Sequence, residues 1–337
     1  HAVGLSLLLS ARALQPAQPQ LAAAVDAEST TPKKWMLTFG DLATNAQMKS
    51  VCEELGESAK CDYTGHPSDG GVPVVVLTTT KHVLQSMVSL QAESVEADGA
   101  TKLIAPVSRE QMIGVHREEE EHWGLDRING RQGLDHNEDI ESTGEGINIF
   151  SFDTGVQVDN PDFGGRAVAT VDFTLPDKTK SREFTVCKPE AQAECAYDGH
   201  GHGTHTAGIA ASLTYGVAKK ANVHAVKVLS DAGSGMWSWF VGALDWTVAY
   251  VKTQSIKQAV ITASLGGTGP VKSVTRAIDA ATAAGVSVVV AAGNEHSNAC
   301  EYLPARVTNA ITVGSTDEFD QMSYFSNYGR CVDVFAP

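Results

Sequence analysis

The stretch DGHGHGTHTAGIA, residues 198–210, decides the fold of this chain of 337 residues. Its first half contains only glycine, histidine and one aspartate, which is typical of a loop. Its second half consists of small residues, which suit a helix that packs closely against its neighbours. The stretch therefore predicts a loop that presents a polar side chain, followed directly by a helix.

Three histidines in this stretch leave three interpretations open. His200, His202 and His205 can belong to a solvated, glycine-rich turn without a chemical role. They can also bind a metal ion, because imidazole is the commonest metal ligand and the last two are three residues apart. One of them can instead be a general base at the start of a rigid helix, since imidazole accepts a proton near neutral pH.

The composition excludes several classes of partner. Lys and Arg number 25 against 40 Asp and Glu, which gives a net charge of -15 and argues against nucleic acid or an anionic membrane surface as a partner. No apolar run approaches the roughly 20 residues that cross a bilayer, so no membrane span is expected. A chain of 337 residues, 42% hydrophobic, is long enough for about two folding units, each with its own core.

The N-terminal segment resembles the end of a secretory signal. Residues 1–13, HAVGLSLLLSARA, contain a short apolar stretch followed by alanines in an A-x-A arrangement. A disordered apolar tail is the alternative. Residues 14–32 are rich in Ala, Gln and Pro and are interpreted as a linker. We therefore expect a secreted protein, either extracellular or in a vacuolar or other endomembrane lumen.

The six cysteines fall as three pairs of sequence neighbours, namely Cys52 with Cys61, Cys187 with Cys195, and Cys300 with Cys331. No C-x-x-C spacing is present, so the pattern does not favour a structural zinc site. A signal-like start together with paired cysteines favours disulfides. The spacing alone leaves their connectivity open.

The first folding unit covers residues 33–98. Strands are predicted from Trp35 and over 72–78, and helices over 44–55 and 81–90, which together make a small α+β unit without a catalytic constellation of its own. Residues 99–122 are polar and end in the run REEEEH. We interpret them as an exposed junction between two domains.

The second unit, residues 123–337, alternates short apolar runs with amphipathic helices. Strands are predicted over 147–152, 223–229, 258–265, 286–292 and 310–314, and helices over 204–213, 238–252 and 273–284. Such alternation indicates a mostly parallel sheet covered by helices on both faces. Parallel sheets of this kind bind ligands at the carboxyl ends of their strands.

Polar groups follow three of these strands, at the edge where the helix of His202 begins. Asp153 follows the first strand, Ser264 lies in the third, and Asn294 comes directly after the fourth. A carboxylate can orient an imidazole and stabilise its protonated form, and an amide can donate a hydrogen bond to an oxyanion. These residues supply most of an acyl-transfer site but lack a nucleophile. As a set of metal ligands, this combination of side chains is unfavourable.

Five motifs occur in the order DTG, GHGTHTAG, SLGG, AAGNE and SNYGRCVDVFAP. Together they resemble the subtilisin-like serine proteases of peptidase family S8, most closely the proteinase K branch. The resemblance covers residues 123–337 and implies an α/β fold, a three-layer sandwich with a mostly parallel central sheet. Residues 33–98 resemble the inhibitor I9 propeptide of that family, a small ferredoxin-like α+β domain that acts on its own enzyme as inhibitor and chaperone. The resemblance implies that this domain is cut off during maturation, within residues 99–122.

The resemblance assigns roles to individual residues. Asp153 matches the triad acid, His202 the general base and Asn294 the oxyanion-hole donor, whereas His205 matches a structural histidine and His200 receives no role. An extended peptide is expected to lie between two strands, with Trp237 as the wall of an upstream apolar subsite. The residues expected to bind this peptide are Gly233, Ser234, Gly235, Trp237, Ser264, Leu265, Gly266, Ala292 and Gly293.

The family pattern also implies a disulfide and a metal site. Cys300 and Cys331 match a bridged pair. Asp333 and the carbonyls of Thr308 and Ala310 match a structural calcium site, although an ordinary capping role for Asp333 is an equal alternative. No cofactor is expected for the chemistry itself.

Two features depart from the family pattern. Asp153 and His202 are 49 residues apart, a long separation for this branch, and we predict that the excess forms a surface loop closed by a Cys187–Cys195 disulfide. The G-T-S-M-A motif that carries the nucleophilic serine is expected about twenty residues beyond Pro337. The chain without that serine is therefore expected to be inactive.

The sequence thus predicts a secreted serine endopeptidase precursor that acts on polypeptides and carries its own propeptide. The first alternative is a non-catalytic binding protein with a subtilisin-like fold that retains its propeptide. A metalloenzyme built on the three histidines is the second alternative.

Overall fold

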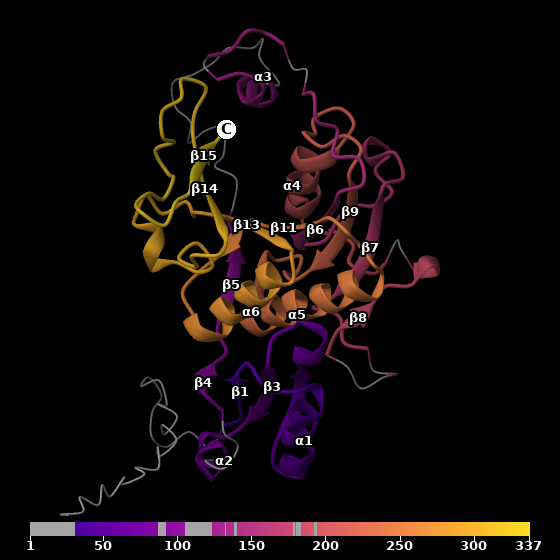
Figure 1. Cartoon of the computed structure of the whole chain (residues 1–337), viewed down its shortest axis with the longest axis vertical. Helices are drawn as coiled ribbons and strands as arrows, with labels where there is room; N and C mark the ends of the chain where they lie inside the picture. The colour runs from indigo at the N-terminus through magenta and orange to yellow at the C-terminus, as the bar shows by residue number, and fades with distance from the viewer. Residues whose placement is uncertain are drawn as a thin grey trace, which may run out of the picture.

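Figure 1 shows a computed structural model of the chain, which describes residues 31–86, 92–104, 123–131, 133–137, 140–177, 179, 183–191 and 194–337. The signal-like stretch, nearly all of the linker, and residues 105–122 of the junction lie outside the described residues. So does the predicted helix beyond residue 86.

The N-terminal part forms a small unit with one antiparallel sheet. Its elements are β1 (Lys33–Thr38), α1 (Asn45–Leu55), β2 (Lys60–Thr64), β3 (Val74–Thr79), α2 (Lys81–Ser86) and β4 (Ser94–Ala97). The strand order is β2-β3-β1-β4, so the sequence order βαββαβ gives a ferredoxin-like sheet. A capping box begins α1, because the Thr44 hydroxyl accepts from the Gln47 N–H while the Gln47 side chain accepts from the Thr44 N–H. The Cys52–Cys61 disulfide joins α1 to β2.

The large unit follows from residue 123. Its helices are α3 (Trp123–Asn129), α4 (His202–Ala211), α5 (Trp237–Thr253) and α6 (Val271–Ala283). Its strands are β6 (Asn148–Asp153), β7 (Ala167–Asp172), β8 (Thr185–Val186), β9 (Asn222–Lys227), β10 (Ser234–Met236), β11 (Ala259–Ala263), β12 (Leu265–Gly266), β13 (Ser287–Ala291), β14 (Ile311–Ser315) and β15 (Val334–Ala336).

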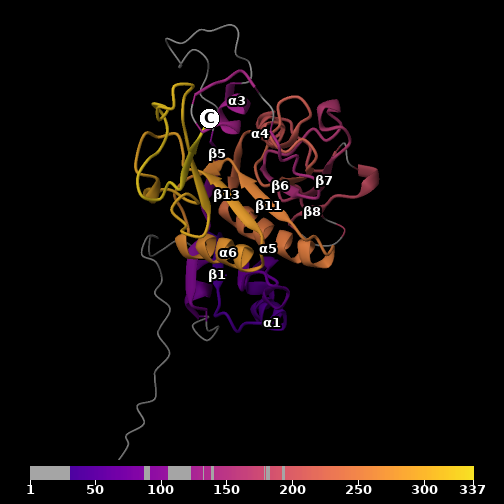
Figure 2. The ribbon, with the colours of Figure 1, turned by 45° about the horizontal axis from the view of Figure 1, so that its top comes forward.

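Within the described residues, eight strands of the large unit form one sheet in the order β15-β14-β13-β11-β6-β9-β7-β8. Every pairing in it is parallel except that of β7 with β8. Helices α5 and α6 cover one face and α4 the other, which gives three layers (Figures 1 and 2). The predicted α/β sandwich with a mostly parallel sheet is confirmed.

The small unit lies against α5 and α6, on the side of these helices away from the large sheet (Figure 1). One apolar core continues through both units, because Met36, Val74 and Val76 of the small sheet join the cluster that includes Phe240 and Leu244 of α5. The strand β5 (Ala100–Leu103) runs from this base into the large unit.

The predicted strand over 258–265 is wrong in one respect, because it is two strands. β11 ends at Ala263 in the large sheet, and β12 pairs instead with β5. The predicted strand over 223–229 is too long, since the N–H groups of Val228 and Leu229 both donate to the Asp153 carbonyl and leave the regular ladder. Prediction missed β7, whose sequence AVATVD contains small residues and gives a weak hydrophobic signal.

The predicted disulfide pairs are joined in the structure. Cys187 pairs with Cys195 and Cys300 with Cys331.

Candidate functional site

The acid and the base come from neighbouring elements at one edge of the large sheet. Asp153 is the last residue of β6, and His202 is the first residue of α4. The Nδ1 atom of His202 lies 2.7 Å from Oδ1 of Asp153, and both residues are buried. The Thr154 N–H also donates to Asp153 Oδ1, at 2.7 Å, which fixes the carboxylate. The geometry therefore holds the imidazole by its Nδ1–H and directs Nε2 away from the acid.

The other ring nitrogen of His202 faces a carbonyl. Nε2 lies 3.1 Å from the carbonyl oxygen of Ile104, the residue after β5. A carbonyl only accepts, and so does the Asp153 carboxylate, so both ring nitrogens are best satisfied as donors in the imidazolium form. Burial lowers the pKa of His202, but the Asp153 carboxylate and the Ile104 carbonyl raise it more, and the net pKa lies above its ordinary value. Protonation of this base is favoured while Ile104 is in place.

The raised pKa of His202 determines how the stability of the folded state changes with pH. A histidine with a folded-state pKa above its unfolded value stabilises the native state fully below the unfolded pKa, and this contribution is lost as pH rises through the folded pKa. We expect NMR titration of the His202 ring to give a pKa above 6.5, and Asp153→Asn to lower that pKa. An unchanged pKa in the variant would show that the carboxylate does not control the ring.

The predicted peptide channel is filled by the chain itself. β5 lies between β10 and β12, with Gly235 opposite Thr101 on one side and Gly266 opposite Lys102 on the other. The Ile104 N–H donates to the Ser264 carbonyl at 2.9 Å. The two walls predicted from the sequence therefore face one another and bind an extended segment by main-chain hydrogen bonds on both sides, as a sheet binds an added strand.

Trp237 lies beneath this segment and is fully buried. Its main-chain N–H donates to the Gly99 carbonyl at 2.9 Å, and its Nε1–H donates to the Thr268 carbonyl at 2.9 Å. The side chain is therefore fixed between the start of β5 and the loop after β12. Sequence reasoning placed Trp237 at an upstream subsite, and in the structure its ring packs in the core below that position.

The turn that carries Asn294 follows β13 and is braced by a residue that sequence reasoning did not single out. Asn327 is fully buried, donates to the Ala292 carbonyl at 2.9 Å, and accepts from the Glu295 N–H at 3.1 Å. Gly293 has φ +107, a backbone conformation that favours glycine. Asn294 itself is half-buried at the carboxyl edge of the sheet. The sequence signal that could have identified Asn327 is its position in the motif SNYGR.

Two further residues outside the predicted set support the turn after Asp153. Asp198 accepts from the Thr154 hydroxyl at 2.8 Å and from the Thr204 N–H at 2.8 Å, and so links the DTG turn to the first turn of α4. Lys227 is buried, donates to the Thr154 carbonyl, and pairs with Asp231 at 2.6 Å. Both residues hold the backbone that positions the acid.

The three histidines of the loop do not converge on one point. The ring centroids of His200 and His202 are 6.3 Å apart in an edge-to-face arrangement. His205 is exposed and lines a cavity between α3 and α4. Among the described residues there is no group of three or more His, Cys, Asp or Glu side chains that could hold a metal ion. The arrangement around His202 gives the metalloenzyme alternative no support.

One residue of the predicted calcium site, Asp333, has a partner within the fold. Asp333 Oδ2 accepts from the Thr312 N–H at 2.8 Å, so one carboxylate oxygen already has a partner in the fold. Thr308 lines a cavity of about 390 Å³ together with Arg306 and Arg330. The calcium site stays a prediction, and so does the alternative, an ordinary capping role for Asp333.

No helix of the described residues has the length and hydrophobicity that crossing a membrane requires.

Comparison with known proteins agrees with this geometry. Residues 144–337, more than half of the chain, match the model of the subtilase family, peptidase S8. The chain is 44% identical over 216 residues to an extracellular serine proteinase of Thermus sp. (strain Rt41A), which covers 64% of this chain and 48% of that protein. It is 36% identical over 290 residues to the subtilisin-like serine protease pepC of Aspergillus niger, which covers 82% of this chain and 47% of the relative.

A solved structure shares the fold. The crystal structure of a cold adapted subtilisin-like serine proteinase aligns with a TM-score of 0.54 and 39% identity, over 64% of this chain and 71% of that one. The chain spans about half the length of the curated relatives that it matches. It belongs to the subtilase family of serine peptidases.

Proposed function

We propose that the chain is part of a secreted serine endopeptidase precursor that cleaves polypeptides. The observation that carries this proposal is the position of Ile104, whose carbonyl faces Nε2 of His202 at the end of a strand bound on both edges. In the complete protein His202, oriented by Asp153, would deprotonate a serine, and Asn294 would stabilise the oxyanion. Three disulfides and relatives named extracellular support secretion, with a vacuolar or other endomembrane lumen as the alternative.

The register of β5 supports a specific maturation point. Ile104 is the last described residue of this segment. Its N–H donates to the Ser264 carbonyl of the channel wall, and its own carbonyl faces Nε2 of His202. The bond after Ile104 is therefore our candidate for the bond cut in maturation. Residues 33–98 would then be the propeptide, 99–122 the junction, and 123–337 the peptidase part.

The small unit has contacts suited to an internal inhibitor and chaperone. The Asp98 carboxylate accepts from the Ser238 N–H at 3.0 Å, in the first turn of α5. The Glu96 carboxylate accepts from the N–H groups of Lys272 and Ser273, in the first turn of α6. Neither helix has a side-chain cap at its own N-cap residue, so the small unit supplies one to each. With β5 in the channel, a substrate cannot enter.

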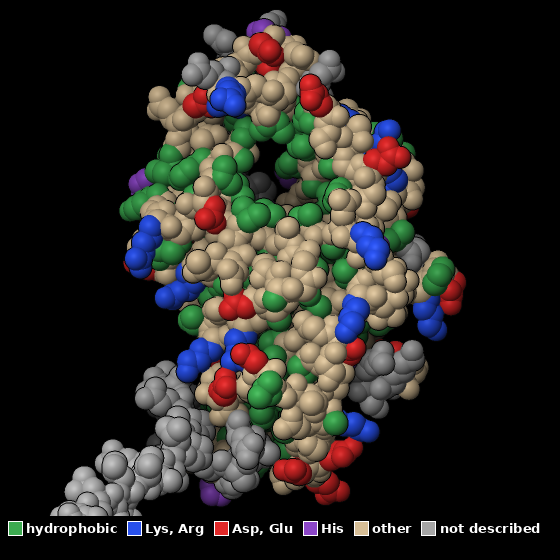
Figure 3. Space-filling model, in the orientation of Figure 1, with side chains coloured by type: hydrophobic (Ala, Val, Ile, Leu, Met, Phe, Trp, Pro, Cys, Tyr) green, Lys and Arg blue, Asp and Glu red, His purple; other side chains and the backbone are tan. Residues whose placement is uncertain are grey.

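A cavity beside α4 supports a nucleophile segment beyond Pro337. The cavity measures about 1060 Å³ and is lined by α3, by α4 and by Ala336 and Pro337 (Figure 3). Apolar residues such as Ile209 of α4 are half exposed in it. A helix that is apolar on most faces is normally buried. We propose that the continuation of the chain fills this cavity and brings its serine to His202.

Sequencing and assay of the complete protein test the proposal. We expect a G-T-S-M-A motif after Pro337, hydrolysis of a denatured protein substrate, and a mature N-terminus at residue 105 by Edman sequencing. A replaced serine in that motif, with no hydrolysis after removal of the small unit, would overturn it.

A non-catalytic binding protein is the second candidate. The observation that favours it is the filled channel, since β5 and the two helix caps can hold the small unit permanently. Stable retention of the uncut chain in the secreted protein would favour this candidate.

Calcium stays a proposal for the segment near Asp333, with oxygen ligands expected from Thr308 and Ala310 as well. If calcium binds there, EGTA lowers the melting temperature of the chain by several degrees, and the effect disappears in Asp333→Asn. An unchanged melting temperature with EGTA removes the calcium proposal.

A further inference from the structure

The long segment between Asp153 and His202 contacts the small unit. Among its described residues, Phe173, Glu183 and Phe184 make this contact, and we call them the clamp residues. They lie within the 49-residue separation of Asp153 and His202 that is long for the family pattern. The contacts of β5 and of the two helix caps lie elsewhere, so the clamp residues form a separate point of attachment.

Tyr63 of β2 is enclosed by the clamp residues and α5. Its ring centroid lies 5.8 Å from that of Phe184 and 6.3 Å from that of Phe173, and the two phenylalanine rings stack at 4.8 Å. Its hydroxyl donates to Asp245 of α5 at 2.7 Å. Gly242 of α5 leaves room for these rings, because a Cβ there would lie 2.9 Å from Phe173 and 3.5 Å from Tyr63. The aromatic contact is therefore buried, and the surface of α5 at Gly242 is complementary in shape to it.

An ion pair lies beside the aromatic contact. The Lys60 ammonium donates to Glu183 Oε1 at 2.5 Å. This hydrogen bond to Glu183 raises the pKa of Lys60, although the lysine is mainly exposed. Exposed ion pairs contribute little energy but can help to select a partner, so this pair favours the placement of Lys60 beside Glu183.

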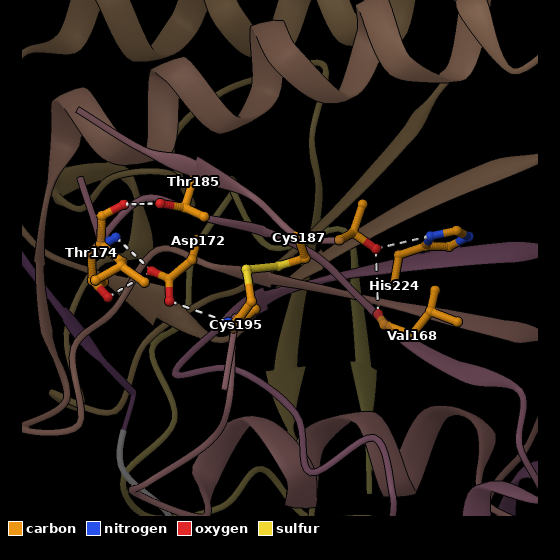
Figure 4. The surroundings of a disulfide bond; sticks show 10 residues. Val168, Asp172, Thr174, Thr185, Cys187, Cys195 and His224 are labelled. Atoms are coloured by element: carbon orange, nitrogen blue, oxygen red, sulfur yellow. Dashed lines mark hydrogen bonds between the residues drawn. A yellow bond between two sulfur atoms is a disulfide. The ribbon is translucent and has the colours of Figure 1, made fainter. Parts of the chain in front are cut away.

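The clamp residues are held by their own unit. Figure 4 shows the Cys187–Cys195 disulfide next to Asp172, the last residue of β7. Asp172 accepts from the Thr174 N–H at 2.8 Å and from the Ala196 N–H at 3.2 Å, so both ends of the segment are tied to one carboxylate. The Thr185 hydroxyl donates to the Leu175 carbonyl at 2.7 Å, which joins two parts of the segment that are ten residues apart. None of these bonds involves the small unit.

We propose that the clamp residues form a second docking site for the small unit, one that keeps it bound after the junction is cut. The partner is residues 31–104 of the same chain, recognised through Tyr63 and Lys60. Release of the clamp then limits how fast the channel opens. This inference rests on the proposed function only in treating the channel as the substrate site.

The test measures release of the small unit and needs no peptidase activity. A recognition sequence for a site-specific protease is placed within residues 109–116 of the full chain, which is immobilised through its C-terminus, cut, and followed by biolayer interferometry. No disulfide crosses the cut, because the three pairs are 52–61, 187–195 and 300–331. We expect Phe184→Ala to speed release about tenfold or more. Leu175→Ala, an exposed position in the same segment, serves as the matched control and should leave the rate within about twofold.

A double-mutant cycle separates contact from general damage. Tyr63→Ala and Phe184→Ala together should speed release less than the product of the single effects, because they remove the same contact. Glu183→Gln, a surface change that does not threaten folding, should speed release about threefold in low salt and less in high salt. Rates within twofold of the parent for Phe184→Ala and Glu183→Gln, or multiplicative effects in the cycle, would overturn the proposal. A failed peptidase assay would overturn the proposed function and leave these release rates standing.

Discussion

Replacement of His202 by alanine in the complete protein lowers kcat for peptide hydrolysis by about 10⁴-fold or more. The physical reason is that His202 is the only group placed, among the described residues, with one nitrogen on the buried Asp153 carboxylate and the other on the carbonyl at the channel end. A serine without this base stays protonated and is a weak nucleophile. The measurement is steady-state hydrolysis of a chromogenic peptide by the matured protein.

The control for this prediction compares the losses of kcat in the single variants with the loss in the double variant. Asp153→Asn should also reduce kcat strongly, and the double variant should be no slower than His202→Ala alone, because the two groups act as a unit. His200→Ala, an exposed neighbour, should retain kcat within about threefold. Multiplicative losses in the double variant would contradict the assignment of one base and its orienting acid.

Replacement of Gly203 by alanine lowers the stability of the chain by about 3 kcal/mol, or roughly 5–10 °C in melting temperature. A Cβ at this position would lie 2.1 Å from the Gly155 carbonyl oxygen and 3.0 Å from Cβ of Asp153. Both are parts of the buried DTG turn and cannot move as a flexible side chain would. Helix α4 must therefore shift away from β6, which also breaks the contact between His202 and Asp153.

Gly208 of the same helix is the matched control. A Cβ there meets nothing within 4 Å in this chain, so Gly208→Ala should be neutral or stabilise the helix by up to about 1 kcal/mol. Differential scanning calorimetry of residues 1–337 compares the two variants. Equal melting temperatures for both would show that the close approach of α4 to β6 is not required.

The large sheet could be predicted because its strands carry strong local signals. The runs that form β6 and β13 are rich in large apolar or β-branched residues, and each is followed by a polar turn. The carboxyl ends of parallel strands share one edge, so the order of strands and helices along the chain is enough to place Asp153 and His202 together. The Cys187–Cys195 disulfide could be predicted because the two cysteines lie eight residues apart within one expected loop, whereas Cys300–Cys331 followed from the family resemblance.

Contacts between residues far apart in the sequence could not be predicted from a local sequence pattern. The apolar run around Ile104 is short and lies in a segment interpreted as a polar junction, yet this segment supplies the strand that fills the channel, 98 residues from His202 in sequence. Ser264 ends the apolar run of β11 without any local breaker, because the split into two strands depends on pairing with β5. The carboxylates of Glu96 and Asp98 cap helices that begin more than a hundred residues later. Such contacts depend on the assembled fold and not on local pattern.

The clamp residues are an intermediate case. The long separation of Asp153 and His202 and the two cysteines within it predicted a closed loop, which the structure contains. Nothing in the local sequence indicated that Phe184 would contact Tyr63, 121 residues away, because an aromatic residue in a polar loop has many possible partners. The partner follows only from the placement of β2 against α5.

Covalent labelling tests the central claim most directly, namely that His202 and Asp153 serve a serine beyond Pro337. The complete protein, freed of its small unit, is treated with a fluorophosphonate reagent and digested for mass spectrometry. We predict one label per chain, on a serine C-terminal to residue 337, and its loss in His202→Ala. Absence of label on the folded protein, or label that persists in His202→Ala at the same rate, would contradict the account.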